Sequence, residues 1–213
     1  MTDGATTVLM RKAYARWAPI YDLVYDKLTE PAACAAVNAA VACGPKVLEA
    51  GVGTGLSLGY YPMNAEVYGV DLSEDMLRRA QEKVDKRGLT HVKSLQVMDV
   101  TRLGFQDGTF DAVTAQFIIT LVPEPETALD EFMRVLKPGG EIVLANHWGQ
   151  PSGPIATLEE LASPIAKAIG WSSAFKAARV EAWAKGTGRM DVVELKPLFP
   201  SGFFKLMRIK KRA

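Results

Sequence analysis

The segment KVLEAGVGTG (Lys46–Gly55) joins a short apolar run to a turn that contains three glycines. An apolar run of this length, bounded by turn residues, is typical of a buried strand. Glycine tolerates backbone conformations and close approaches that other residues block, so the turn can bring its backbone close to a ligand. The segment therefore predicts a strand followed by a ligand-binding loop.

Apolar runs and amphipathic stretches alternate from Lys46 to about Leu144, which is the pattern of a parallel sheet with crossover helices. Helices are expected in the intervals between the strands. The expected strands are Lys46–Ala50, Glu66–Asp71, Ser94–Met98, Phe110–Ala115 and Glu141–Asn146. The sequence thus predicts an α/β fold whose mostly parallel sheet carries helices on both faces.

Capping residues fix the limits of two of these helices. After the second strand, Ser73 is a suitable N-cap and Gly88 follows the last turn. Met76, in the first turn, is assigned to the core. A second helix spans Pro125–Leu136 and ends at the motif Lys137-Pro138-Gly139-Gly140, where proline blocks continuation.

Other segments lie outside this alternation. Residues Val8–Glu30 form an aromatic amphipathic helix that Pro19 interrupts, and Ile155–Lys185 form a helical insertion. Runs at Met190–Leu195 and Phe203–Ile209 predict a terminal antiparallel hairpin. The 213 residues fit a single domain, with a cap (1–30), a core (40–147), an insertion (150–186) and the hairpin (187–213).

Composition restricts the class of protein. A net charge of +1 gives no general attraction for nucleic acid. The two cysteines, Cys34 and Cys43, lack neighbours at metal-ligand spacing, so no metal is expected. No stretch approaches the ~20 apolar residues of a membrane span. We therefore expect a cytoplasmic monomer that makes only peripheral membrane contact and binds no nucleic acid.

Acidic residues near the glycine loop indicate which ligand it binds. The spacing of Gly51, Gly53 and Gly55 differs from the dinucleotide fingerprint, and Glu49 would repel a pyrophosphate. A ligand with ammonium and sulfonium groups would instead be attracted. Asp71, about 20 residues beyond the first glycine, is placed for ribose hydroxyls, and Asp99 for an adenine amino group.

Successive motifs then carry a resemblance. Over roughly residues 40–147 the chain resembles the class I S-adenosylmethionine methyltransferases. The matching segments are Val47–Gly55, Gly69–Ser73, Met98–Val100, Asp107–Asp111 and Leu136–Gly140. The resemblance implies S-adenosylmethionine as the cofactor and S-adenosylhomocysteine as its product. The cofactor-binding residues it implies are Glu49, Gly51, Val52, Gly53, Asp71, Leu72, Asp99, Val100 and Gln116.

The segment YARWAPIYDLVYD (Tyr14–Asp26) resembles the opening helix of bacterial phospholipid N-methyltransferases and, less fully, of quinone-biosynthesis methyltransferases. Aromatic faces bind cations without neutralising them. Tyr14, Tyr21 and Tyr25 are therefore candidate substrate-binding residues. Packing of the same aromatic face on the core remains an alternative.

Basic and aromatic side chains suit an anionic membrane surface. They occur together at Lys176, Arg179 and Trp183, around Arg11–Arg16, and at Arg208–Arg212. Arg179 is also a candidate for binding a lipid phosphate. The expected partners are therefore a phospholipid substrate and an anionic membrane surface.

The predicted reaction is methylation of the ethanolamine headgroup of phosphatidylethanolamine towards phosphatidylcholine. Tyr25 and His147 are the candidate catalytic residues, and His147 is also a candidate substrate-binding residue; either could receive the proton that leaves the amine. His147 could equally orient substrate or pack on Trp148. The alternatives are a quinone-precursor C-methyltransferase and a non-catalytic cofactor-binding module at a lipid surface.

Overall fold

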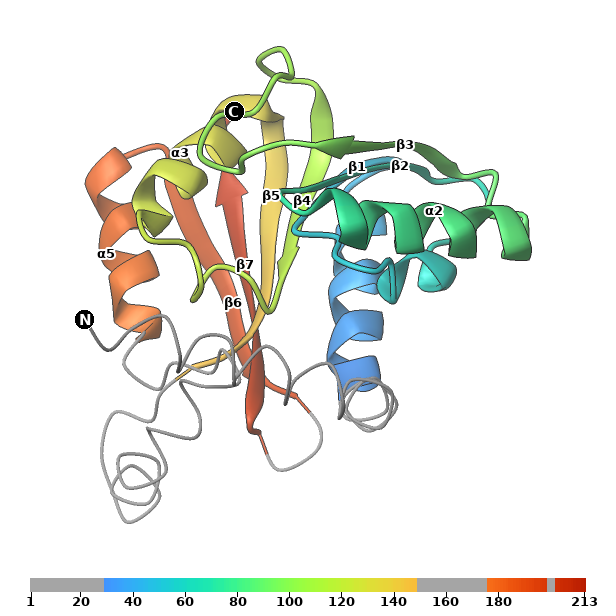
Figure 1. Cartoon of the computed structure of the whole chain (residues 1–213). Helices are drawn as coiled ribbons and strands as arrows, with labels where there is room; N and C mark the ends of the chain where they lie inside the picture. The colour runs from blue at the N-terminus through green and yellow to red at the C-terminus, as the bar shows by residue number, and fades with distance from the viewer. Residues whose placement is uncertain (1–28, 149–175, 199–201) are drawn as a thin grey trace, which may run out of the picture.

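The computed structural model describes residues 29–148, 176–198 and 202–213. Within these ranges a seven-stranded sheet has the order β3-β2-β1-β4-β5-β7-β6 (Figure 1). The strands are β1 (Lys46–Ala50), β2 (Glu66–Asp71), β3 (Val92–Val97), β4 (Phe110–Gln116), β5 (Leu136–His147), β6 (Met190–Pro197) and β7 (Phe204–Lys211). The pairs among β1 to β5 are parallel, whereas β7 is antiparallel to β5 and β6. The predicted mostly parallel sheet with a C-terminal hairpin is confirmed.

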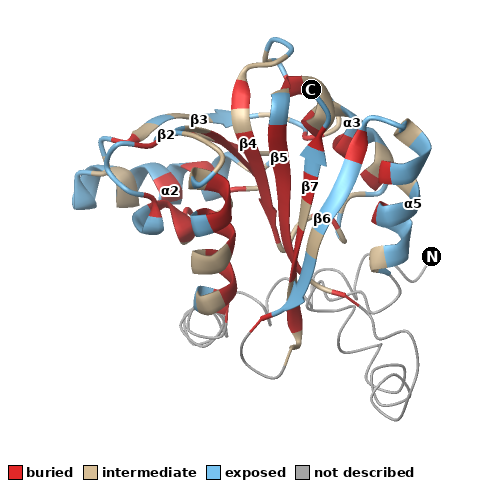
Figure 2. Cartoon of the chain, turned by 180° about the vertical axis from the view of Figure 1, so that it is seen from behind, coloured by how far each residue is buried: buried red, intermediate tan, exposed pale blue. Residues whose placement is uncertain are grey.

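Helices cover both faces of this sheet (Figures 1 and 2). The helix at residues 29–41 and α2 (Glu74–Arg87) pack on one face, and α3 (Pro125–Val135) and α5 (Ala177–Thr187) pack on the other. The central strands are covered on both sides and contain few polar residues, as a parallel sheet requires. The structure thus confirms the predicted layers.

Local signals set the limits of α2 as expected. The Ser73 hydroxyl accepts a hydrogen bond from the Met76 amide at 3.3 Å, and Gly88 ends the helix in the left-handed conformation with φ 61°. Glycine adopts this conformation without the steric cost that a Cβ imposes. The caps therefore set both limits of α2, and because the helix follows directly after β2, its N-terminus lies near the carboxyl end of that strand.

The expectation of a helix in every interval is wrong in two places. Between β1 and β2 there is only a short 3-10 helix, η1 (Ser57–Tyr60), and residues 98–109 between β3 and β4 form a loop. Arg134 on α3 holds this loop by donating to the carbonyl oxygens of Leu103 and Phe105 at 2.8 and 2.7 Å. Side-chain bonds thus replace a helix there.

The junction between α3 and β5 also differs from expectation. The helix ends at Val135 and the strand begins at Leu136, because Leu136 already pairs with Phe110 before a register shift. Gly139, with φ 80°, lies in the irregular stretch that follows. The glycine pair therefore makes a bulge within β5 and does not precede the strand.

Several expected segments lie partly or wholly outside the described residues. These are the N-terminal cap up to residue 28 and residues 150–175 of the insertion. The insertion's end is helical as expected, since α5 covers Ala177–Thr187. In the described ranges, no helix is both long enough and apolar enough to span a membrane.

Candidate functional site

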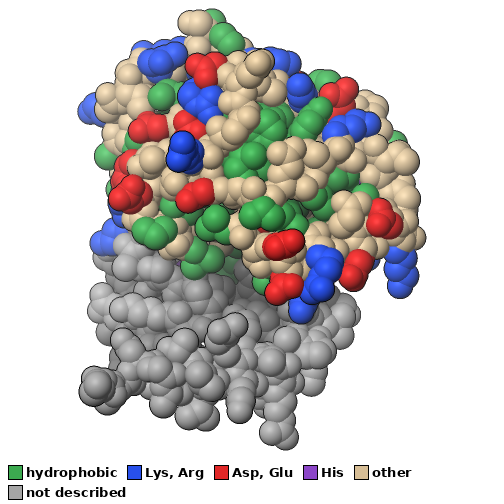
Figure 3. All heavy atoms as spheres, turned by 45° about the horizontal axis from the view of Figure 1, so that its top comes forward, with side chains coloured by type: hydrophobic (Ala, Val, Ile, Leu, Met, Phe, Trp, Pro, Cys, Tyr) green, Lys and Arg blue, Asp and Glu red, His purple; other side chains and the backbone are tan. Residues whose placement is uncertain are grey.

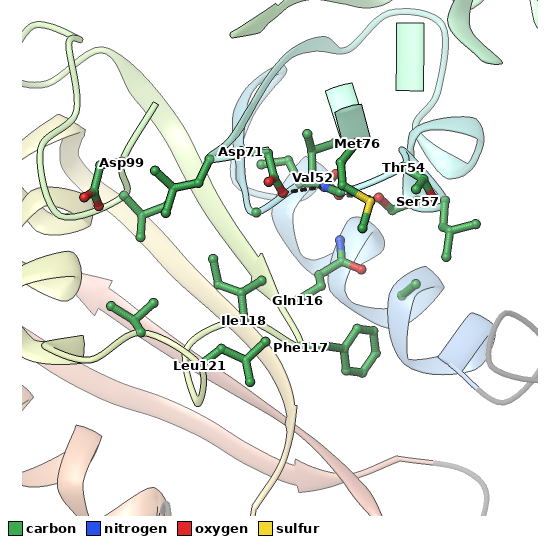
Figure 4. A pocket seen from close by; sticks show the side chains of 18 of the residues that line it. Val52, Thr54, Ser57, Asp71, Met76, Asp99, Gln116, Phe117, Ile118 and Leu121 are labelled. Carbon is green, nitrogen blue, oxygen red and sulfur yellow. Dashed lines mark hydrogen bonds between the residues drawn. The ribbon is translucent and has the colours of Figure 1, made fainter. Parts of the chain in front are cut away.

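A cavity of about 730 Å³ opens at the carboxyl ends of β1, β2 and β4, beside the loop that follows β3 (Figure 4). In open α/β sheets this is the crevice where ligands bind. Its charged lining residues, among those the structure describes, are Glu49, Asp71, Asp99 and Glu124. All are carboxylates, so the cavity favours a cationic ligand.

The structure brings together every residue predicted to bind the cofactor. These residues, which all line the cavity, are Glu49, Gly51, Val52, Gly53, Asp71, Leu72, Asp99, Val100 and Gln116. They come from the ends of four neighbouring strands and the turns that follow them. Three of the five motifs, Val47–Gly55, Gly69–Ser73 and Met98–Val100, therefore meet at one site.

The glycine loop is held by the neighbouring strand. The amides of Gly51 and Val52 both donate to the carbonyl oxygen of Val70, at 2.8 and 3.0 Å. Gly53 has φ 54°, and a Cβ placed there would meet nothing within 4 Å. At Gly51 a Cβ would lie 2.5 Å from the Ile118 side chain. Gly51 thus allows close packing, whereas Gly53 leaves its side of the loop open.

Asp71 joins the loop to the start of α2. One carboxylate oxygen accepts from the Gly53 amide and the other from the Ser73 amide, each at 2.9 Å. A carboxylate oxygen can accept more than one hydrogen bond, so both can still receive a ribose hydroxyl. Asp71 therefore shapes the loop in addition to its expected role.

Asp99 is exposed at the start of the loop that follows β3. Its Oδ1 accepts from the Thr101 amide and hydroxyl at 2.8 and 2.7 Å. These two bonds lower the pKa of the Asp99 carboxyl group. The group is thereby kept ionised and oriented at the cavity.

Glu49 lies beneath the glycine loop and is 2% exposed. Its carboxylate accepts hydrogen bonds from the hydroxyl groups of Ser57 and Tyr61, the latter at 2.8 Å. Burial raises the pKa of Glu49 to about 7, although both hydroxyls act to lower it. The negative charge expected beside the loop is therefore only partly formed at neutral pH in the cofactor-free protein.

Gln116 ends β4 and is 8% exposed. Among the described residues its amide nitrogen has no hydrogen-bond partner, and the side chain points into the cavity (Figure 4). An unpaired buried donor is costly, so a ligand with an acceptor atom would stabilise it. The next residue, Phe117, has φ 60°, a strained conformation of the kind found at ligand sites.

Sequence reasoning missed part of the lining. Thr29 and Ala33 come from the helix at residues 29–41, which was not predicted. Glu124 contributes from the N-cap of α3. Met76 was assigned to the core but is 41% exposed and lines the cavity. Met76 is apolar, which suggested a core position, but only the surrounding structure decides whether protein or ligand covers it.

His147 lies at the end of β5, but it is absent from the described lining of the cavity. Its Nδ1 donates to the carbonyl oxygen of Phe203 at 3.0 Å, and its ring stacks on the Phe203 ring with centroids 4.1 Å apart. Since a carbonyl can only accept, Nδ1 carries the proton. The contacts shown therefore give His147 a packing role against the C-terminal hairpin.

Arg179 does not face the cavity either. It forms a two-pronged ion pair with Glu126 on α3, at 2.5 and 2.7 Å. This pairing lowers the pKa of Glu126. On the same face of α5, Trp183 donates to Asp130 at 2.8 Å. Arg179 remains exposed beside these pairs, so the expected membrane contact of Arg179 and Trp183 stays a prediction.

The basic C-terminal run is also paired within the protein. Arg208 binds Glu141 at 2.8 Å, and Arg212 binds Asp191 at 2.6 Å. Lys211 donates to the carbonyl oxygens at the end of α3. These pairs engage Arg208, Lys211 and Arg212 within the fold, while Lys210 and Arg212 stay exposed, and the expected contact of this run with a membrane stays a prediction. Tyr14, Tyr21 and Tyr25 lie outside the described residues.

The sheet order, the reversed β7 and the acidic crevice together define the class I methyltransferase fold. A solved S-adenosylmethionine-dependent methyltransferase from Aquifex aeolicus has the same fold, with a TM-score of 0.64, 20% identity, and coverage of 92% of this chain and 98% of that one. A family model described as methyltransferase domain matches residues 48–144.

Two curated relatives are similar at the level of sequence. A phosphatidylethanolamine N-methyltransferase from Cereibacter sphaeroides is 42% identical over 201 residues, which cover 94% of this chain and 97% of the relative. A demethylmenaquinone methyltransferase from Thermus thermophilus is 38% identical over 148 residues, or 66% of each chain. The chain therefore belongs to the S-adenosylmethionine-dependent methyltransferase family, and it is an enzyme of that class.

Proposed function

We propose that this methyltransferase methylates the ethanolamine amine of phosphatidylethanolamine, towards phosphatidylcholine. The observation that carries the proposal is the extent of similarity to the Cereibacter relative, which covers 94% of the chain. Methyltransferases share the cofactor half and differ elsewhere, so acceptor specificity resides outside the common core. The similarity to the quinone enzyme covers 66% of the chain.

The lining of the cavity suits a cationic cofactor next to a lipid substrate. Its carboxylates attract the positive charges of S-adenosylmethionine. An apolar wall lies opposite them and consists of Phe117, Ile118, Leu121, Val122 and Pro123. Leu121 is 57% exposed, and in Figure 3 hydrophobic side chains gather in the middle of the face shown. An apolar wall beside the reacting end suits a substrate with acyl chains.

The residues present fit the cofactor. In the proposed arrangement Asp71 binds the ribose hydroxyls, Asp99 and the Val100 amide bind the adenine, and Leu72 and Val52 contact its faces. Glu49 and the loop glycines receive the amino-acid end. The buried Gln116 amide nitrogen, which has no partner in the part of the chain that the structure describes, would donate to a carboxylate oxygen there.

S-adenosylmethionine supplies an electrophilic methyl group that the neutral amine accepts. The protein aligns the two reactants and excludes water, which lowers a barrier by roughly 7 to 11 kcal/mol in the best model systems. A primary alkylammonium has a pKa near ~10.4 in water, and desolvation lowers it. No strong base is therefore required, and Tyr25 or His147 remain proposed routes for the proton.

We further infer a cytoplasmic monomer that meets the membrane peripherally, because its substrate is a bilayer lipid. With two basic clusters partly paired internally, further candidates for lipid contact are the apolar cavity rim and the N-terminal segment with Tyr14, Tyr21 and Tyr25. Sedimentation with anionic vesicles tests this inference. Binding that persists at high salt would indicate apolar contact, and loss of binding at high salt would indicate electrostatic contact.

A vesicle assay tests the proposed function. The protein and isotope-labelled S-adenosylmethionine are incubated with vesicles that contain phosphatidylethanolamine, phosphatidylglycerol alone, or a demethylated quinone, and the products are resolved by mass. Methylated phosphatidylethanolamine supports the proposal, and Asp71→Asn should strongly reduce its formation when the cofactor concentration is not saturating. Product from the quinone alone would make the chain a C-methyltransferase. Cofactor binding without any product would favour a non-catalytic module.

A further inference from the structure

A chain of buried hydroxyl groups supports Glu49 beneath the glycine loop. Ser57 from η1 and Tyr61 just after it both donate to the Glu49 carboxylate. Tyr61 is also 3.3 Å from the Thr114 hydroxyl on β4. Because the single Tyr61 proton is directed to Glu49, Thr114 must donate to the Tyr61 oxygen. The direction of the chain therefore runs from Thr114 through Tyr61 to Glu49.

This cluster is enclosed on all sides but one. Ser57 and Tyr61 are 4% and 3% exposed, and Thr114 is fully buried. Glu49 and Ser57 nevertheless line the cavity, so the carboxylate meets whatever occupies that end. Buried polar groups that are fully paired are held in one orientation. The hydroxyls thus fix the carboxylate at the place where a ligand enters.

No charged group among the described residues neutralises Glu49. Its pKa is raised by burial and lowered only by its bonds to Ser57 and Tyr61. The Lys83 ammonium donates to the Thr54 hydroxyl at 3.2 Å. Titratable groups on the elements packed around Glu49 include Tyr61, Asp71 of β2, Lys83 of α2, His91 before β3 and Glu30 of the first helix, and of these only Tyr61 affects the pKa of Glu49. Within the described part of the chain, the compensating charge is therefore left to the ligand.

We propose that Tyr61 and Ser57 are positioning residues that hold Glu49 for the cofactor's ammonium group, so that cofactor binding expels the Glu49 proton to solvent. This inference rests on the cofactor site of the proposed function. The protonated carboxyl group of the empty site donates to a neighbour or to water. When a cation arrives, the ionised form gains its attraction, and the two hydroxyl groups supply the remaining bonds.

The consequence is a pH-dependent affinity. Near pH 7, where about half of the Glu49 groups are protonated, binding should release about half a proton. Affinity should decline as pH falls below the pKa of Glu49, to roughly 30-fold below its full value at pH 5.5, because each binding event must then displace a full proton. The ligand's own amine loses its proton at about pH 8, so the comparison is made below that pH. Removing the Tyr61 hydroxyl should shift this fall to higher pH, since its bond acts to lower the pKa of Glu49.

Isothermal titration calorimetry of the full chain with S-adenosylhomocysteine tests the proposal. Titrations at pH 7 in buffers of different ionisation enthalpy count the protons released. Tyr61→Phe should bind about 10-fold more weakly at pH 7 than wild type and show a fall in affinity centred at higher pH. Tyr60→Phe is the matched control, because Tyr60 is 38% exposed and adjacent in sequence.

Glu49→Gln separates the remaining contributions. This variant should bind S-adenosylhomocysteine weakly. The number of protons that it exchanges on binding then reports only the ligand's own amine. Binding by wild type with the same proton count as Glu49→Gln would overturn this inference while leaving the proposed function intact. Equal affinities and pH profiles for Tyr61→Phe and Tyr60→Phe would do the same. If wild type fails to bind the ligand at all, the proposed cofactor site falls together with this inference. Should Tyr61→Phe not fold, the comparison of wild type with Ser57→Ala and Glu49→Gln decides the matter.

Discussion

Replacing Glu49 with glutamine should stabilise the cofactor-free protein at high pH. The pKa of this carboxyl group lies at about 7 in the folded protein against an ordinary value of 4.5. The folded state therefore holds a proton that the unfolded state has released between these values, and the free energy of unfolding falls as pH rises through them. The raised pKa therefore costs roughly 3 kcal/mol of the free energy of unfolding at pH 8, and this cost vanishes below pH 4.5.

Urea unfolding at several pH values measures this effect. The free energy of unfolding of wild type is subtracted from that of Glu49→Gln at pH 8, and again at pH 5, and the two differences are compared. The effect of altered hydrogen bonds to Ser57 and Tyr61 largely cancels in this comparison. Glu66→Gln, at an exposed position of β2, is the control. Parallel stability curves for wild type and Glu49→Gln across this range would refute the burial argument.

Three further perturbations follow from the site. Gly51→Ala should lower the free energy of unfolding by about 2 kcal/mol or more, because its Cβ would lie 2.5 Å from Ile118. Gly53→Ala meets open space and should cost about 1 kcal/mol for its positive φ. Equal losses of stability in urea unfolding would contradict the packing role of Gly51. Arg134→Lys should release residues 98–109, because lysine cannot replace the bonds to Leu103 and Phe105; amide exchange at Thr101–Asp107 should then rise, and unchanged protection would disprove the anchor. Asp71→Asn should weaken cofactor affinity about 10- to 100-fold through lost bonds to a charged acceptor, measured by calorimetry against Asp75→Asn, an exposed site on α2; equal affinities would remove Asp71 from the site.

Local sequence signals determined the parts of the fold whose cause is local. The limits of β1, β2 and α2 follow from an apolar run, its flanking glycines and the caps at Ser73 and Gly88. Glu49, Asp71 and Asp99 could be named in advance because each stands at a strand end, and parallel strands end at the same edge of the sheet. The other cofactor residues were implied by the resemblance to the class I methyltransferases.

Tertiary structure decided what the side chains do once distant segments meet. Arg179 and the C-terminal arginines looked available for a membrane, yet carboxylates from α3, β5 and β6 neutralise several of them. Met76 was assigned to the core as an apolar residue of a helix, whereas in the structure it lines the cavity. Pairing and exposure depend on residues 21 to 67 positions apart in the chain, which local patterns do not encode.

Glu49 shows both contributions in one residue. Its place before the glycines indicated a carboxylate at the cofactor loop, and that position is confirmed. The sequence determined that the acid is there. Only the fold placed it out of water, against Ser57 and Tyr61, where burial raises its pKa to about 7. The charge of a side chain at neutral pH depends on its solvation, and solvation is a property of the packed structure.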